Sequence, residues 1–415
     1  MTLDPVHFDG ITRLAGRISR DVDRRDHRAF AETVWTDFLD PLVRDGDPVV
    51  EPLGEHRRRV VDLEAAALQD PPYPTQHGLD SGTINPTTYK NGLVVDVAQA
   101  AMTAVPSDLE LHRGRTVVMT VHSNDPTLTI PDEGWIADDE GYTRKRVLRV
   151  PQVNRYEAAV VHELALYLAE GKHARENADV VDDVLILDGP IYPKGLHSWS
   201  DRQPELADLL AEDDRPRDVI ENYIRLVERF VERDVPLVGF VKTPSSRLIT
   251  RTVRETTGDA PWVNDAAFFS QVLERREDDE RLTDGLTFTG WYVSRGGTDE
   301  MLSAPDGAFG LERELAPEAY ALTFCVIYDP RTDTVYRLEA PAAFTSDEDR
   351  RERLLRQVLA GVAVQRGPPE AVAKADALAR IGRAETRALQ DSLEQTFDSE
   401  RDTTYDEDRW GLLGE

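Results

Sequence analysis

The order of hydrophobic patterns between residues 80 and 257 restricts the fold of this chain more than any other feature. Two β-rich runs, NGLVVDVAQAAM and RTVVMTVHSN, follow the segment that begins at Asp80, and together they predict a three-strand meander. Helical periodicity then returns in QVNRYEAAVVHELALYLAE. Two short apolar runs, VLIL and VPLVGFV, alternate with further helical segments. A meander followed by alternating helix and strand predicts one mixed sheet with helices packed on it.

This element order is the RNase H-like arrangement, and we therefore expect an α/β fold with an RNase H-like mixed sheet flanked by helices. Residues 1–70 show helical spacing in HFDGITRLAGRI, FAETVWTDFLDPLV and HRRRVVDLEAAAL, which predicts a helical N-terminal region. The RNase H-like domain is expected over 71–385. Late helices over about 347–395 and an acidic tail over 386–415 complete the predicted organisation.

Length and composition are typical of a soluble protein with a large core. The chain has 415 residues, 40% of them hydrophobic, and no run approaches eighteen consecutive apolar residues. The N-terminus lacks the basic-then-apolar pattern of a signal peptide. A single cysteine, Cys325, excludes an intramolecular disulfide framework. We therefore expect a cytoplasmic protein that does not enter a membrane.

The net charge of −29 is unusual, because 78 acidic residues stand against 49 basic ones. Such a balance ordinarily argues against nucleic-acid binding, since phosphates are neutralised by Lys and Arg. However, only six of the basic residues are lysine, and the acids are spread over nearly all polar segments. This pattern favours adaptation to molar salt, where the Debye length is about 3 Å at 1 M. The competing interpretation is a protein that repels DNA and binds a basic partner.

Two aspartates are placed at ends of predicted strands. Asp80 lies in LDSGT, where the first strand begins, and Asp188 closes the strand VLILD. If the first and fourth strands are neighbours, as the topology requires, the two carboxylates lie side by side and repel unless a divalent cation neutralises them. Oxygen ligands of this kind suit Mn²⁺ or Mg²⁺. The alternative for either residue alone is a helix cap or a turn.

A third ligand should come from the helix that follows the meander. Its N-terminal end is expected nearest the strand ends, which favours Glu157 over the weaker candidate Glu163. The two residues are six positions apart, about 9 Å along a helix axis, so they cannot both serve. The alternative for each is a solvated helix acid.

Four segments, in this order, resemble the motifs of the NurA family of nucleases. LDSGT followed by NGLVVDVAQAA resembles the first motif, usually an Asp-Gly-Ser string, and LILDGPIYPKG resembles the second, a hydrophobic strand that ends in Asp-Gly-Pro or Asp-Gly-Ser. LVGFVKTPSSRLI looks like the family's strand with its lysine and a following serine. VYRLEAPAAF is similar to its late Arg-x-Glu-x-Pro strand. The resemblance runs from about residue 75 to about residue 385.

The resemblance implies an RNase H-like, Mn²⁺-dependent DNA nuclease of a haloarchaeal type. Members of the family are 5′-to-3′ exonucleases with endonuclease activity on single strands. They form homodimers that dock on a hexameric HerA-type ATPase, and the pair resects DNA ends for recombination. Carried over by position, the metal ligands are Asp80, Glu157 and Asp188. Two ions are expected, one to activate water and one to stabilise the leaving oxygen.

One stretch departs from the family pattern. The family commonly carries Gly-Tyr-Pro and then, eight residues after the tyrosine, a histidine, whereas here GPPEAVAKAD has Pro368 and Asp376 at these positions. An aspartate is a competent metal ligand, so Asp376 is a candidate fourth carboxylate of the site. The substitution could conserve metal binding, or it could mark weakened activity.

Residues after the strand VPLVGFV are candidates for DNA binding. Lys242 is placed to hold a phosphate, and Ser245, Arg247 and, from the helix after them, Arg251 follow it. A weaker site candidate, Arg337, lies two positions from Glu339 on a predicted strand, where the pair is expected to form a structural ion pair. The competing functions are a catalytically weak DNA-binding or adaptor subunit of the ATPase complex and an RNA-directed enzyme of the same fold.

Overall fold

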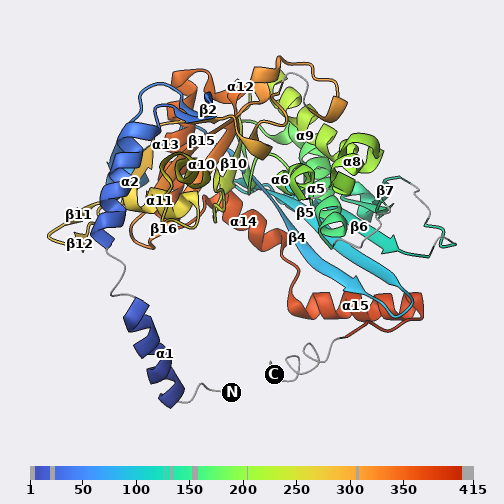
Figure 1. The fold of residues 1–415 in the computed structure, drawn as a ribbon. Helices are drawn as coiled ribbons and strands as arrows, with labels where there is room; N and C mark the ends of the chain where they lie inside the picture. Colours follow the sequence, from blue (N-terminus) through green and yellow to red (C-terminus); the bar gives the residue numbers. More distant parts are fainter. Residues whose placement is uncertain are drawn as a thin grey trace.

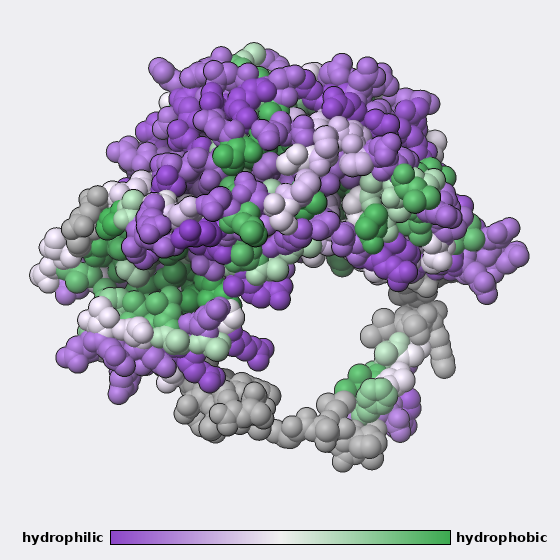
Figure 2. All heavy atoms as spheres, turned by 180° about the vertical axis from the view of Figure 1, so that it is seen from behind, coloured by the Kyte–Doolittle hydropathy of each residue, from purple (hydrophilic) through white to green (hydrophobic). Residues whose placement is uncertain are grey.

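The centre of the molecule is one mixed β-sheet that helices cover on both faces (Figure 1). The computed structural model describes residues 5–18, 24–125, 127–130, 134–151, 158–202, 204–304 and 308–403. Polar side chains occupy most of the face of the molecule that Figure 2 shows. None of the described helices has the combination of length and apolar composition that a membrane crossing requires.

Five neighbouring strands make the part of the sheet that carries the predicted motifs. In spatial order they are β6 (Arg115–Ser123), β5 (Leu93–Val105), β4 (Gln76–Thr88), β9 (Val184–Asp188) and β10 (Leu237–Val241). β5 is antiparallel to both of its neighbours, whereas β9 is parallel to β4 and to β10. The first and fourth strands of the predicted order are therefore adjacent, and the RNase H-like fold predicted from the sequence is confirmed.

The sheet continues beyond both sides of these five strands. Antiparallel strands extend it past β10: β16 (Thr334–Pro341), β15 (Leu322–Asp329), then β14 (Tyr292–Ser294), β2 (Asp47–Pro52) and β1 (Leu42–Arg44), with β13 (Gly285–Thr289) and β3 (Arg58–Asp62) branching from β15. On the other side, β8 (Thr143–Arg149) is parallel to β6 and antiparallel to β7 (Ile136–Asp138). A separate hairpin joins β11 (Arg276–Glu277) and β12 (Glu280–Arg281).

Two groups of helices bury opposite faces of the central strands. They include α5 (Ala158–Glu176) and α9 (Asp214–Glu232) on one face, and α13 (Glu348–Gln365) and α14 (Glu370–Ala379) on the other. In β9, Leu185 and Leu187 pack toward the first group, and Val184 and Ile186 toward the second. A strand buried on both faces needs apolar residues at every position, which explains the uninterrupted run VLIL.

The described part of the chain contains eleven further α-helices. They are α1 (Pro5–Ile18), α2 (Arg24–Phe38), α3 (Leu63–Ala67), α4 (Leu109–Arg113), α6 (Lys194–His197), α7 (Trp199–Arg202), α8 (Pro204–Glu212), α10 (Leu248–Thr257), α11 (Asp265–Leu273), α12 (Ala342–Thr345) and α15 (Arg383–Phe397). In Figure 1, α1 lies apart from the body of the molecule.

The expectation that residues 1–70 are helical is wrong between residues 42 and 62. The segment HRRRVVDLEAAAL forms the strand β3 and then a one-turn helix, α3, whose N-terminus is capped by the Asp62 side chain. β3 pairs with Gly285–Thr289 along its whole length, and this long-range pairing overrides the local helical spacing. At the other end, the predicted boundary at residue 385 falls inside α15, whose Leu393 and Phe397 pack on the β4–β5 hairpin.

Candidate metal centre

Three aspartates from three elements meet on the α14 side of the sheet. Asp80 of β4, Asp188 at the end of β9 and Asp376 of α14 place carboxylate oxygens within 4.8 Å of one another. Strand register accounts for the first two, because Leu79 pairs with Leu187 and the aspartates are the next residue of each parallel strand. Among the described residues, no other group of three His, Cys, Asp or Glu side chains is this compact.

Two glycines on β4 bring Asp376 to the other aspartates. Gly78 and Gly82 flank Asp80 at two-residue spacing, so all three point to the same face of the sheet. A Cβ atom at Gly78 would lie 2.2 Å from the Ala371 carbonyl oxygen, and one at Gly82 would lie 2.1 Å from that of Ala379. The backbone of α14 therefore rests directly on β4, with Asp376 between its two contact points.

The cluster has an electrostatic cost in the absence of a cation. The Asp188 side chain is only 4% exposed. Burial, followed by the charges of Asp188 and Glu170, raises the pKa of Asp80 to about 8. Burial also raises the pKa of Asp188, although Lys242 opposes the shift. Crowded, desolvated carboxylates of this kind favour a bound cation.

Lys242 lies inside the cluster, one residue beyond the end of β10. Its Nζ atom donates a hydrogen bond to Asp188 Oδ2 at 2.6 Å and lies 3.8 Å from Asp376 Oδ1. Burial lowers the pKa of Lys242, but its hydrogen bond to Asp188 and the neighbouring negative charges outweigh that effect, so the pKa is raised. Arg380, one helical turn after Asp376, binds Asp376 Oδ2 at 2.8 Å from a more exposed position.

The helix acid nearest these aspartates is Glu170, which sequence reasoning missed. It accepts hydrogen bonds from Ser81 Oγ at 2.6 Å and from the hydroxyl of the buried Tyr223 at 3.1 Å. Burial raises the pKa of Glu170 to about 7, and the charge of Asp188 adds to that shift. Glu157, the residue favoured from the sequence, lies outside the described residues.

The length of β4 explains why the helix acid lies so far along α5. β4 continues for eight residues past Asp80, and α5 runs antiparallel beside that extension. His162 bonds Asp96, which lies opposite the Ile84–Thr87 part of β4, whereas Glu170, about 12 Å further along the helix, bonds Ser81. The start of the helix is therefore level with the far end of the strand. β4 is thirteen residues long and ends at Thr88. A sequence prediction that extended the strand this far would have placed Glu170, and not the start of the helix, beside Asp80.

The two weaker candidates occupy structural ion pairs. Glu163 pairs with Arg202 at 2.9 Å and accepts a hydrogen bond from the Trp199 indole. Arg337 is buried and pairs with Glu339 at 2.9 Å and with Asp299 at 3.1 Å. The predicted ion pair between Arg337 and Glu339 is confirmed. The structure does not place either candidate with the three aspartates.

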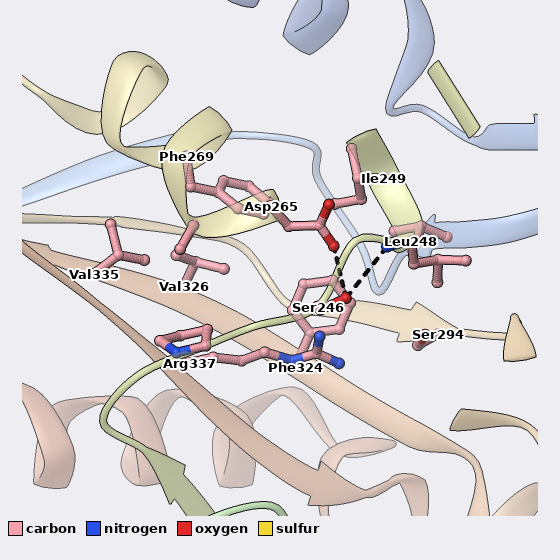
Figure 3. A pocket seen from close by; sticks show the side chains of 13 residues that line it. Ser246, Leu248, Ile249, Asp265, Phe269, Ser294, Phe324, Val326, Val335 and Arg337 are labelled. Carbon is pink, nitrogen blue, oxygen red and sulfur yellow. Dashed lines mark hydrogen bonds between the residues drawn. The ribbon is translucent and has the colours of Figure 1, made fainter. Parts of the chain in front are cut away.

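The loop after Lys242 is held firmly and presents the other predicted DNA-binding residues. Ser246 donates a hydrogen bond to Asp265 Oδ2 at 2.6 Å (Figure 3). The amide of Thr250 donates to Asp265 Oδ1 at 2.9 Å. The cavity behind the loop is about 10 Å³, room for a single water, so it cannot hold a nucleotide. Ser245 and Arg247 are exposed on the outer side of this loop.

These features make the cluster suitable for a divalent cation. Its donors are carboxylate oxygens from a strand, a strand end and a helix, which are hard ligands that Mg²⁺ and Mn²⁺ prefer. The cluster includes no cysteine or histidine, so it does not have the donor set of a zinc site. Asp80, Asp188 and Asp376 are the residues that would hold such an ion, and Glu170 adjoins them.

Comparisons with known proteins agree with this fold. The profile of the NurA domain matches residues 74–381. A crystal structure of the NurA nuclease from Sulfolobus solfataricus is similar over 95% of this chain and 98% of that one, with 12% sequence identity and a TM-score of 0.50. A crystal structure of NurA bound to dAMP and manganese matches over the same shares with 10% identity and a TM-score of 0.43.

No curated protein sequence matches the chain. The family profile nevertheless covers about three quarters of its length, including β4, β9, β10 and α14, which carry the acidic cluster and Lys242. The chain belongs to the NurA family.

Proposed function

We propose that this chain is a divalent-metal-dependent DNA nuclease whose active site is the cluster of Asp80, Asp188 and Asp376. The observation that carries the proposal is the convergence of these three carboxylates within 4.8 Å. Membership of the NurA family supports it, because the solved NurA proteins are described as a nuclease and as binding manganese and dAMP. Phosphodiester hydrolysis is the chemistry that such an acidic centre serves.

The bound ion would polarise the phosphate and lower the pKa of a water molecule. We expect Mn²⁺ or Mg²⁺, and a pair of ions, as the family resemblance implies. The protein supplies the oxygen ligands and their spacing. Glu170 replaces Glu157 as our candidate for the helix acid of the site. Its hydrogen bonds to Ser81 and Tyr223 orient its carboxylate behind Asp80.

DNA would approach along the loop after β10. Arg247 is exposed and forms no ion pair with the described residues of the chain. Ser245 is exposed beside it, on a loop that Ser246 and Asp265 fix in place. We expect these residues and Lys242 to contact backbone phosphates, since guanidinium and ammonium groups provide the charge-assisted hydrogen bonds that phosphates accept.

The test is cleavage of labelled single-stranded DNA at molar KCl, with Mn²⁺, Mg²⁺ or EDTA. We expect cleavage with Mn²⁺ and none with EDTA, and weaker cleavage of RNA of the same sequence. Equal or preferred cleavage of RNA would support the RNA-directed alternative instead. End-labelled duplexes with single-stranded tails distinguish the expected 5′-to-3′ exonuclease and single-strand endonuclease activities.

A second candidate function is a catalytically weak DNA-binding or adaptor subunit. Asp376 favours it, because a histidine is common at this position in the family that the sequence resembles. Binding of DNA without cleavage under any divalent metal at molar KCl would establish this alternative.

The biological setting belongs to the same proposal. We infer a homodimer that acts with a HerA-type ATPase in DNA end resection for recombinational repair, in a cytoplasm of high salt. An exposed apolar stripe on α1, formed by Phe8, Ile11 and Leu14, supports the presence of a protein partner. Mass measurement of the chain alone and with the ATPase, at molar KCl, tests both associations.

A further inference from the structure

Lys242 is the cation that most closely contacts the acidic cluster. Its ammonium group lies 2.6 Å from Asp188 and 3.8 Å from Asp376, which are contributed by different elements. Phe240 pairs with Asp188 in the parallel strands, so Lys242 leaves the end of β10 beside the carboxylate end of β9. Among the described acids, Arg380 forms an ion pair with Asp376 and not with the buried Asp188, and its side chain is 69% exposed.

We propose that Lys242 is the built-in counter-ion of the cluster in the metal-free protein, and that a divalent cation binds by displacing its ammonium group from Asp188. This inference rests on the proposed metal-dependent function. It adds a competition between a side chain and the metal for the same carboxylates. It also assigns Lys242 two positions, one against Asp188 without metal and one directed at substrate phosphate with metal.

The Lys242 ammonium group and a divalent cation cannot both bind these carboxylates, because the two positive charges repel each other. A divalent ion bound by oxygens of Asp188 and Asp376 would lie a few ångströms from an ammonium group that contacts the same oxygens. The repulsion is large because the Asp188 side chain is almost completely removed from water. Without metal, the Lys242 ammonium group stabilises the native state, because three converging carboxylates with no counter-ion would destabilise it.

The side chain at this position suits movement. Lysine carries a compact charge on a flexible four-carbon stem, whereas the planar guanidinium of arginine forms a fixed bidentate pair with a carboxylate. The chain uses arginine for 43 of its 49 basic residues, so a lysine here is exceptional. The Lys242 side chain is also 37% exposed, which gives it room to turn toward solvent and substrate.

Lys194 provides a matched control. It is also a half-buried lysine, and its ammonium group pairs with Glu339 at 2.7 Å and with Asp299 at 2.9 Å. Neither of these acids belongs to the aspartate cluster. The variants Lys242→Gln and Lys194→Gln therefore each remove one cation from two carboxylates, but only the first touches the candidate metal centre.

Thermal unfolding with EDTA and with saturating Mn²⁺, at constant molar KCl, tests the proposal. We expect Lys242→Gln to lower the Tm by about 3 °C in EDTA and by less than about 1 °C with Mn²⁺. By linkage, the Kd for Mn²⁺ should fall at least about threefold, because the metal no longer displaces a cation. Lys194→Gln should lower both Tm values equally and leave the Kd unchanged.

Failure of the Lys242 displacement and failure of the proposed metal dependence give different results. If Lys242→Gln lowers the Tm equally with and without Mn²⁺ and does not tighten Mn²⁺ binding, Lys242 is not displaced and the inference is wrong. If Mn²⁺ neither binds nor stabilises the unaltered protein, the proposed metal-dependent function fails, and the displacement proposal is overturned with it. In that second case a loss of Tm in Lys242→Gln would still show that Lys242 neutralises the cluster.

A second measurement needs no variant. Only six lysines are present, so the rate of amine acylation at each can be followed by peptide mass spectrometry in the unaltered protein. Mn²⁺ should accelerate the labelling of Lys242 severalfold relative to Lys194. An unchanged ratio with Mn²⁺ bound would show that the ammonium group stays on Asp188.

Discussion

At the scale of single residues, the three aspartates are held by different means. Asp80 and Asp188 are neighbours through strand register, whereas Asp376 arrives on a helix and is 37% exposed. The first two therefore provide the fixed part of the centre, and the third completes it. We therefore expect substitution of Asp376 to be less damaging than substitution of Asp80 or Asp188.

Asp376→Ala should reduce the rate of Mn²⁺-dependent DNA cleavage about tenfold or more, because the ion loses one of three carboxylate ligands. Asp376→His should restore part of that activity if the position serves the role of the family's histidine. The increase in Tm on adding Mn²⁺ should shrink in the alanine variant. A fully active Asp376→Ala would make Asp376 an ordinary helix acid paired with Arg380.

Glu170→Gln should impair cleavage far more than Glu163→Gln. Glu170 adjoins Asp80 through Ser81, whereas Glu163 is engaged by Trp199 and Arg202. We expect a loss of about 10–100-fold for Glu170→Gln, with its circular dichroism spectrum unchanged. Glu157→Gln, at a position outside the described residues, belongs in the same series. If it proves the most damaging of the three, the assignment to Glu170 is incorrect.

The metal-free protein should lose stability as pH rises. Folding raises the pKa of Asp80 to about 8 and that of Glu170 to about 7, so the native state binds protons that the unfolded state has released. The sign follows directly: native stability decreases between about pH 4 and pH 8. We expect the Tm in EDTA to fall across this window and the Asp80→Asn variant to show a shallower fall.

Saturating Mn²⁺ should remove most of that decrease, since the metal binds the deprotonated carboxylates and stabilises the native state more as pH rises. A Tm in EDTA that is constant or increases from pH 5 to pH 9 would mean that Asp80 and Glu170 do not carry the raised pKa values.

At the scale of elements, the site depends on how closely α14 approaches β4. Gly78 and Gly82 allow the contact, and the buried alanines Ala371, Ala375 and Ala379 line the facing side of the helix. Gln99 and Thr103 of β5 also donate hydrogen bonds to α14 carbonyls, at 2.9 and 2.8 Å. The position of Asp376 is therefore set by backbone packing and not by its own side chain.

Gly82→Ala should displace α14 from β4, because the added Cβ would lie 2.1 Å from a backbone oxygen. We expect a loss of about 1–3 kcal/mol in the free energy of unfolding and a weaker affinity for Mn²⁺. Gly367→Ala is the control, since its added Cβ meets only one atom, 3.9 Å away. Equal effects of the two substitutions on Mn²⁺ affinity would contradict the role assigned to this contact.

The element scale also shows what could be predicted from the sequence. The strands around Asp80 and Asp188 and their adjacency followed from local periodicity and from the limited topologies of α/β sheets. The strand β3 could not be predicted in this way, because its pairing with β13 joins segments more than two hundred residues apart. Glu170 was missed because the position of a helix beside a strand depends on the length by which the strand extends, here to Thr88.

At the scale of the whole molecule, the net charge of −29 opposes folding and DNA binding at low salt. Ion pairs offset part of it locally, as at Glu274, whose carboxylate is bound by Arg276 at 2.8 Å and Arg281 at 2.6 Å. The remaining acids repel over a distance that salt shortens. We therefore expect the Tm to rise steeply between 0.1 and 1 M KCl, where the Debye length falls from about 10 to about 3 Å.

Salt also strengthens hydrophobic burial, which raises the Tm by itself. The shape of the plot of Tm against KCl concentration therefore distinguishes charge screening from this second effect. Charge screening predicts that most of the increase in Tm occurs below about 1 M KCl and that the Tm rises less steeply with KCl above that concentration. A Tm that changes linearly with KCl up to 3 M, or not at all, would contradict adaptation to molar salt.

The central claim is that Asp80 and Asp188 hold the metal that drives DNA cleavage. The most direct measurement is the single-turnover rate of single-stranded DNA cleavage with Mn²⁺ for Asp80→Asn and Asp188→Asn, which remove charge but little volume. We predict at least a hundredfold loss, about 3 kcal/mol, in each variant while the fold is retained. Near-normal rates in either folded variant would show that the metal centre lies elsewhere in the chain.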